Sequence, residues 1–235
     1  MTDPKSHHRR CLRSVIAVTV VLVAGLSAKP GVATEQEFQQ WSSVTFRYDF
    51  SDRVTGSFSP RLRFDEDLER IRDLTLRPSV AIGLADRITL GLGYSYTKGI
   101  ASGINDENRP WQSITFRTPI DELSMSHRFR LEERITENSS GVSLRSRYRL
   151  AVSHPVINES WYVAGTEEVF VALNSSGGRD SGFDQNRLSV GLGHLFTPRI
   201  GAELGYMWNY KDRSGADLSA HVVTFNFTFR TGNRN

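Results

Sequence analysis

The stretch Val-Thr-Phe-Arg-Tyr-Asp-Phe, residues 44–50, decides the fold because apolar and polar residues alternate strictly along it. Successive side chains of a β-strand point to opposite faces. The four apolar residues of the stretch therefore share one face, and Thr45, Arg47 and Asp49 share the other. The stretch predicts a strand with one apolar face and one charged face.

The same two-residue alternation recurs along most of the chain, and no segment shows a sustained helical period. The clearest further segments are 58–64, 74–84, 88–96, 125–132, 142–150, 187–192, 200–209 and 223–229. Segments 111–117 and 161–173 are the weakest of eleven that can be counted. Bacterial single-chain barrels have even strand numbers, so about twelve strands are expected, with ten as second choice. The missing strand would lie between residues 34 and 41.

The connections between these segments alternate in length. Tight links at 85–87, 118–121 and 197–199 take turns with longer polar links at 98–110, 136–141 and 174–183. Short turns on one side and long loops on the other are typical of outer-membrane barrels. Aromatic residues near segment ends suit the interfacial girdles of such a barrel: Tyr94, Tyr96, Tyr206, Trp208, Tyr210, Phe227 and Phe229. The fold class is therefore an all-β, up-and-down antiparallel transmembrane β-barrel.

An N-terminal signal peptide is expected over residues 1–33, followed by one barrel domain over 34–235. Three arginines precede the apolar run 15–26, and small residues follow it. The run is too short to cross a membrane comfortably as a helix. Cleavage is expected after Ala33, with Ala28 as the alternative. Such a signal predicts export through the Sec pathway, here to a Gram-negative outer membrane. The only cysteine, Cys11, precedes the apolar run, so the processed chain has no thiol.

Charge argues against a nucleic-acid partner. Removing residues 1–33 lowers Lys plus Arg from 29 to 24 and Asp plus Glu from 26 to 25, so the formal net charge falls from +3 to −1. The basic charge of the full chain therefore comes partly from the signal peptide, and the processed chain lacks the positive charge that nucleic-acid binding needs. The expected partners are outer-membrane lipid and lipopolysaccharide, the barrel-assembly machinery and small anionic solutes.

The polar face of the predicted strands is rich in arginine. Its charged candidates for contact with the lumen or a solute are Arg61, Arg63, Arg77, Arg117, Arg128, Arg130, Glu132, Arg145, Arg147, Arg149, Glu168, Arg187 and Glu203. Arginine outnumbers the carboxylates, so a net positive interior is predicted.

Two interpretations of these arginines remain open. They form an ion-paired network that fills a non-conducting structural barrel, since charges facing lipid would be costly. Alternatively, they line a narrow passive channel favouring small anions, because guanidinium groups suit carboxylates and phosphates. Inward glycines at 83, 91, 93, 191, 193, 201 and 205 leave room in the lumen or permit tight coiling.

A lipid-modifying enzyme is a minor alternative, and the expectation is that the protein is not an enzyme. His127, His194 and His221 fall on the apolar register, and His154 falls in a predicted turn. No nucleophile, histidine and carboxylate converge on one face. The histidines also lack the near spacing that a metal site needs, so no catalytic residue, metal or cofactor is expected.

Several motifs resemble the uncharacterised outer-membrane proteins of domain-of-unknown-function family 2490. The motifs are the segments 128–134, 145–150, 168–170, 186–188, 191–193 and 205–206, together with a late His221. The resemblance spans roughly residues 41–229. It implies the barrel and the location, and it brings no known substrate or catalytic residue. The ending, in which Arg230 to Asn235 follow Phe229, departs from barrels whose last residue is aromatic.

Overall fold

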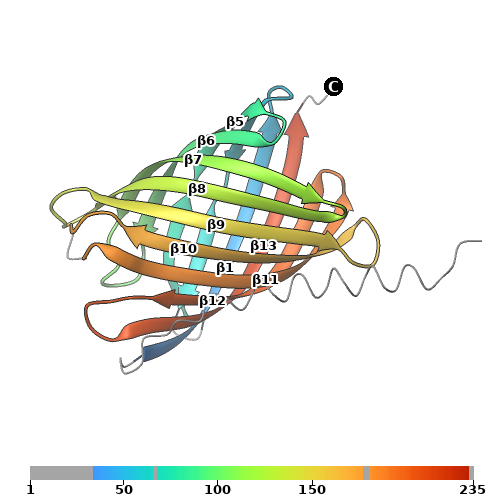
Figure 1. The fold of residues 1–235 in the computed structure, drawn as a ribbon. Coiled ribbons are helices and arrows are strands. Elements are labelled where there is room, and N and C mark those ends of the chain that lie inside the picture. The colour runs from blue at the N-terminus through green and yellow to red at the C-terminus, as the bar shows by residue number, and fades with distance from the viewer. Residues whose placement is uncertain (1–33, 66–67, 177–179, 233–235) are drawn as a thin grey trace, which may run out of the picture. The chain divides into compact units, whose positions relative to one another are not determined.

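A computed structural model describes residues 34–65, 68–176 and 180–232, and these form a single β-sheet closed into a barrel (Figure 1). The expected signal segment 1–33, with Cys11, lies outside the described residues. Among the described residues, no helix is long and apolar enough to span a membrane. The predicted fold class, an antiparallel all-β barrel, is confirmed.

Thirteen strands make up the sheet. They are β1 (Thr34–Asp49), β2 (Val54–Phe58), β3 (Arg61–Asp65), β4 (Arg70–Leu76), β5 (Pro78–Ala85), β6 (Ile88–Gly99), β7 (Glu107–Ile120), β8 (Leu123–Thr136), β9 (Ser143–Pro155), β10 (Trp161–Ala172), β11 (Gly182–Thr197), β12 (Ile200–Lys211) and β13 (Asp217–Gly232). The two weakest predicted segments are thus confirmed as parts of β7 and β10.

Two of the barrel's spanning segments are each broken into a pair of strands. β2 and β3 both pair with β1 and are separated at Ser59 and Pro60, because proline has no N–H for the ladder. β4 and β5 both pair with β6 and are separated at Arg77. The breaks lie opposite each other, since the Ser59 N–H donates to the Arg77 carbonyl at 3.0 Å. Thirteen strands therefore make eleven spanning segments.

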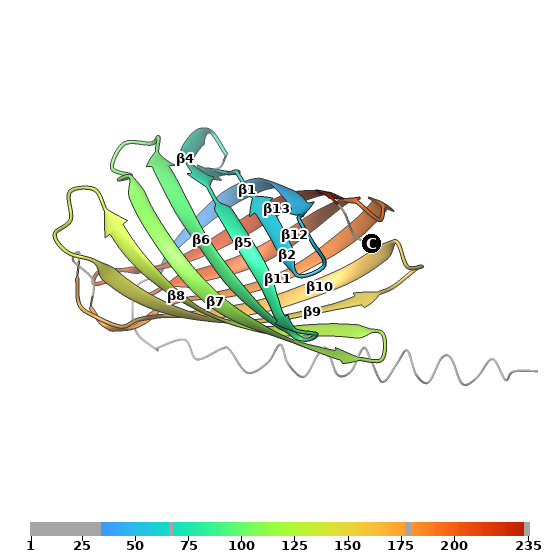
Figure 2. The same cartoon turned by 90° about the horizontal axis from the view of Figure 1, so that it is seen from above.

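The barrel closes through a parallel pairing of β1 with β13, from Thr34↔Asp217 to Asp49↔Gly232 (Figure 2). All other pairings are antiparallel, so an odd number of segments brings the first and last strands together in parallel. The barrel therefore has eleven spanning segments instead of the expected twelve or ten strands. The missing strand sought at 34–41 does not exist, because those residues form the first half of β1.

The alternation of short and long connections is confirmed. Short turns join the strands at one end, at 50–53, 86–87, 121–122, 156–160 and 198–199. The connections at the other end, where β1 begins, are longer at 100–106, 137–142, 173–181 and 212–216, whereas the connection at 66–69 has only four residues. His154, expected in a turn, lies instead near the end of β9.

Large apolar side chains cover the outside of the barrel. Phe129 on β8 is 50% exposed, and Val190 and Leu204 on β11 and β12 are 54% and 55% exposed. The polar residues next to them in sequence point inward. A small apolar cluster also lies inside, near the parallel seam: Trp41, Met207, Leu218, Ala220 and Val222.

Candidate functional site

The interior of the barrel holds a cavity of about 1040 Å³. Its lining includes most of the predicted charged candidates, namely Arg61, Arg63, Arg77, Arg128, Arg130, Arg145, Arg147, Arg149, Glu168, Arg187 and Glu203. Strand alternation alone places these side chains inside, because they occupy the inward register of their strands. The structure places Arg117, which was also predicted to face the lumen, outside the cavity lining. It is exposed near the end of β7 and donates to Thr89 Oγ1 at 3.1 Å.

One wall of the cavity, formed by β8 to β10, is an ion-paired network. Glu132 is fully buried just behind the lining and accepts from Arg145 at 2.7 Å and from Arg147. Glu168 pairs with Arg147 and with Arg128, both at 2.8 Å. These carboxylates offset like charges that face each other across β8 and β9, as in the pair Arg128↔Arg149.

A second carboxylate group on β7 was missed by the sequence analysis. Glu107 pairs with Arg134 at 2.5 Å and with Arg109. The error arose because residues 107–110 were assigned to a long polar link. The alternation of Glu107, Arg109 and Trp111 continues the pattern of β7 and was the available signal.

Several guanidinium groups inside the barrel pack against aromatic rings. The sequence analysis did not predict these contacts. Arg130 lies 3.7 Å from the ring centre of Trp111. Arg145, Arg147 and Arg187 lie 4.5–4.9 Å from that of Phe170, which is fully buried. Cation–π contacts of this kind hold guanidinium groups in place without neutralising them.

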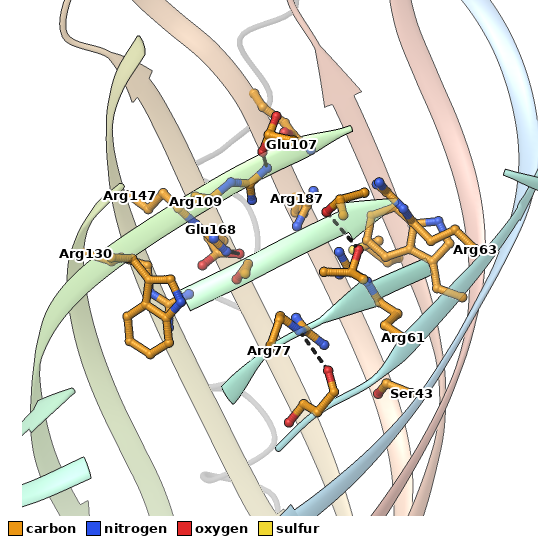
Figure 3. Close-up of a pocket in the computed structure, with 18 of the residues that line it drawn as sticks. Ser43, Arg61, Arg63, Arg77, Glu107, Arg109, Arg130, Arg147, Glu168 and Arg187 are labelled. Atoms are coloured by element: carbon orange, nitrogen blue, oxygen red, sulfur yellow. Dashed lines mark hydrogen bonds and ion pairs between the residues drawn. The ribbon is translucent and has the colours of Figure 1, made fainter. Parts of the chain in front are cut away.

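A second group of arginines lies around the ring of Trp41 on β1. Arg61, Arg63 and Arg187 lie 4.8, 5.2 and 5.0 Å from the ring centre of Trp41. Figure 3 shows Arg61 and Arg63 across the cavity from Arg130 and Arg147. Arg63 pairs with Asp73 at 2.6 Å. Within the described part of the chain, no carboxylate lies within 4.0 Å of the charged nitrogens of Arg61, Arg77 or Arg187.

Two of the inward glycines make room for large side chains. A Cβ atom on Gly93 would overlap the Trp111 ring, and one on Gly193 would overlap the Tyr162 ring. Gly191, in contrast, belongs to the lining of the cavity.

A fixed loop borders the cavity at the end with long connections. Asp106 accepts from Lys98 Nζ at 2.9 Å, Tyr96 Oη at 2.8 Å and the Gly99 N–H at 3.0 Å. The Lys98 contact, followed by that of Tyr96, lowers the pKa of Asp106. These bonds hold the loop 100–106, which contributes Gly103 to Asn105 to the lining.

The histidines of the described residues, at 127, 154, 194 and 221, lie outside the cavity lining. His127 and His221 bond to the hydroxyl groups of Tyr148 and Tyr206 at 2.8 and 2.6 Å. His194 packs against Trp161, with ring centres 4.3 Å apart. Among the described residues, no three His, Cys, Asp or Glu side chains are grouped closely enough to hold a metal ion.

Together these features define a closed β-barrel with an arginine-lined interior. Residues 38–220 match the family described as "Protein of unknown function (DUF2490)", and because this is most of the chain, the protein belongs to that family. The predicted membership is confirmed.

A solved structure described as a "NanC porin structure in rhombohedral crystal form" is similar in fold, with a TM-score of 0.53 and 15% sequence identity. The similarity covers 80% of this chain and 91% of the other. No curated protein matches the chain. The porin likeness supports the barrel architecture.

Proposed function

We propose that this protein is an outer-membrane β-barrel that acts as a narrow passive channel favouring small anionic solutes. The exposed apolar side chains on the outside suit hydrocarbon, and a closed sheet leaves no unpaired backbone edge in lipid. Outer-membrane lipid, lipopolysaccharide and the barrel-assembly machinery are the partners that this location implies. The proposed role is not enzymatic, since the histidines of the strands lie away from the cavity.

The observation that carries the channel proposal is the charge of the cavity lining. Thirteen arginines and Lys211 line the cavity, against Glu107, Glu168 and Glu203. Even with Asp73 and Glu132 just behind the lining, cations are in excess. An excess of fixed positive charge in a narrow space concentrates anions and excludes cations.

The test is ion selectivity in a planar lipid bilayer. We expect the purified protein to conduct in a KCl gradient with a reversal potential that favours chloride. Arg77→Gln and Arg149→Gln should reduce this preference, because both residues line the cavity without a carboxylate within 4.0 Å among the described residues. Arg199→Gln, in an exposed turn, removes the same charge outside the cavity and should leave the potential unchanged. Cation preference or no selectivity would contradict the proposal.

A second candidate is a structural barrel that does not conduct. The network around Glu132 and Glu168, packed with Trp111 and Phe170, favours it because these groups fill much of one side of the lumen. This candidate predicts no conductance, with stability as the main role of the arginines.

The stability of that network can be measured directly. Glu132→Gln leaves the Arg145 and Arg147 charges buried without their shared carboxylate, and we expect a loss of about 3–5 kcal/mol in the free energy of unfolding. Glu122→Gln is the control, since the Glu122 side chain is 76% exposed. Urea unfolding from lipid vesicles compares the two variants, and equal stabilities would show that the network contributes little.

A further inference from the structure

We propose that the arginines around Trp41 form a binding site for a small dianion, with Arg61 and Arg187 as its main cationic groups. The inference deepens the proposed channel function and rests on it, because the site lies in the path of the solute. It assigns the network around Glu132 and Glu168 to the support of the barrel, and the arginines around Trp41 to the binding of the anion.

The Trp41 ring holds the site in a fixed place. Its side chain is 5% exposed, and its indole N–H donates to Gln39 Oε1 at 2.9 Å. The guanidinium carbons of Arg61 and Arg187 lie 4.8 and 5.0 Å from the ring centre. Both guanidinium groups are therefore held beside the same ring, at one place in the lumen.

The two main cationic groups of the site have no carboxylate in direct contact. Arg63 has Asp73 as its partner, but Arg61 and Arg187 have no carboxylate within 4.0 Å in the described ranges. Like charges held together in a partly dry interior repel one another strongly. An anion from solution would reduce this repulsion.

Hydrogen-bond donors point to the same conclusion. The buried Nε of Arg61 has no acceptor among the described residues. Arg187 Nε and Nη2 donate to the side-chain oxygen of Gln185 at 2.8 and 3.0 Å, which leaves its other terminal nitrogen for a ligand. Buried donors are normally satisfied, and an unsatisfied one marks a place for a missing partner. Guanidinium groups favour phosphate, sulfate and carboxylate oxygens, which accept two parallel hydrogen bonds.

The charge of the site favours a dianion over a monoanion. Arg61 and Arg187 carry two positive charges, because arginine stays protonated in proteins. A chloride ion leaves half of this charge in place, whereas sulfate or phosphate neutralises two units at one position. The cavity of about 1040 Å³ leaves ample space for such a group.

Tryptophan fluorescence gives a test that does not depend on conduction. Sulfate is titrated into the detergent-folded protein, with chloride at equal ionic strength as the reference. We expect a saturable change in emission with sulfate, which disappears in Trp41→Phe because Trp41 is the reporter. The other three tryptophans remain in that variant.

Charge variants locate the site. Arg61→Gln and Arg187→Gln should each weaken sulfate binding about tenfold, as expected when one charge-assisted hydrogen bond is lost. Arg128→Gln removes the same charge from the network around Glu168 and should weaken binding less than twofold. Folding of each variant is checked by heat-modifiable migration, and Arg61→Lys, which loses the guanidinium fork, replaces Arg61→Gln if the latter does not fold.

The outcomes separate the site from the channel. Saturable sulfate binding in a protein without conductance would refute the channel and keep the site. Anion-selective conductance without a sulfate-specific fluorescence change would refute the site and keep the channel. Equal weakening by Arg128→Gln and Arg187→Gln would also overturn the site, because binding would then reflect only the general charge of the lumen.

Discussion

Small residues on the inward face decide which large side chains fit inside the barrel. Gly93 lies beside the ring of Trp111, and that ring is held on its other side by Arg130 at 3.7 Å. A methyl group at position 93 would therefore meet atoms that have little freedom to move. Glycine is required here by close approach, and not by an unusual backbone angle.

Gly93→Ala should lower the free energy of unfolding by about 1–3 kcal/mol, the usual range for overpacking. Gly165→Ala is the matched control, because a Cβ atom there would have its nearest neighbour at 3.5 Å, an ordinary contact. Urea unfolding from vesicles measures both variants. Equal stability of the two would show that the Trp111 ring can shift without cost.

At the scale of single residues, the sequence predicted which side chains face inward but not which of them are paired. Arg147 and Arg187 share the same predicted register. Arg147 meets two carboxylates, whereas Arg187 meets two aromatic rings. Alternation depends only on the strand itself, whereas pairing depends on the register between neighbouring strands and, for Trp41 and Arg187, on strands far apart in sequence.

At the scale of strands, the parallel seam between β1 and β13 is the feature that local patterns miss. Ser43 Oγ donates to Asn226 Oδ1 at 2.6 Å across it, and Arg230 makes two bonds to Asp49, at 2.6 and 2.8 Å. Arg230 belongs to the C-terminal extension that departs from barrels ending in an aromatic residue. The seam gives this extension a structural role.

A disulfide can test the seam. Ser43→Cys with Asn226→Cys places two thiols at paired, inward positions, and we expect them to cross-link under mild oxidation. Ser42→Cys with Asn226→Cys is the control, since Ser42 lies on the opposite face of β1. Migration on a non-reducing gel reports the result. Failure of the first pair to cross-link in folded protein would rule out the parallel closure.

At the scale of the whole molecule, the apolar exterior requires a lipid environment in the proposed location. Leu204 is 55% exposed on β12, next to the inward Glu203. A charge at such a position must enter hydrocarbon when the barrel inserts.

Leu204→Arg should reduce stability in lipid vesicles by up to about 2–4 kcal/mol, the cost of arginine near the bilayer midplane. Ser214→Arg, in the exposed connection between β12 and β13, adds the same charge outside the strands and should have little effect. Unfolding from vesicles compares them. Equal stability would contradict a lipid-facing position for Leu204.

The sequence by itself determined the strands, their apolar and charged faces, the alternation of short turns and long loops, and hence the barrel. These properties follow from the two-residue period of a strand, which is local. Only the tertiary structure decided that eleven spanning segments close through a parallel seam, and which of the inward arginines are paired with carboxylates. Both depend on contacts between strands, at the β1–β13 seam and across β8, β9 and β10, and no local pattern within one strand relates those residues.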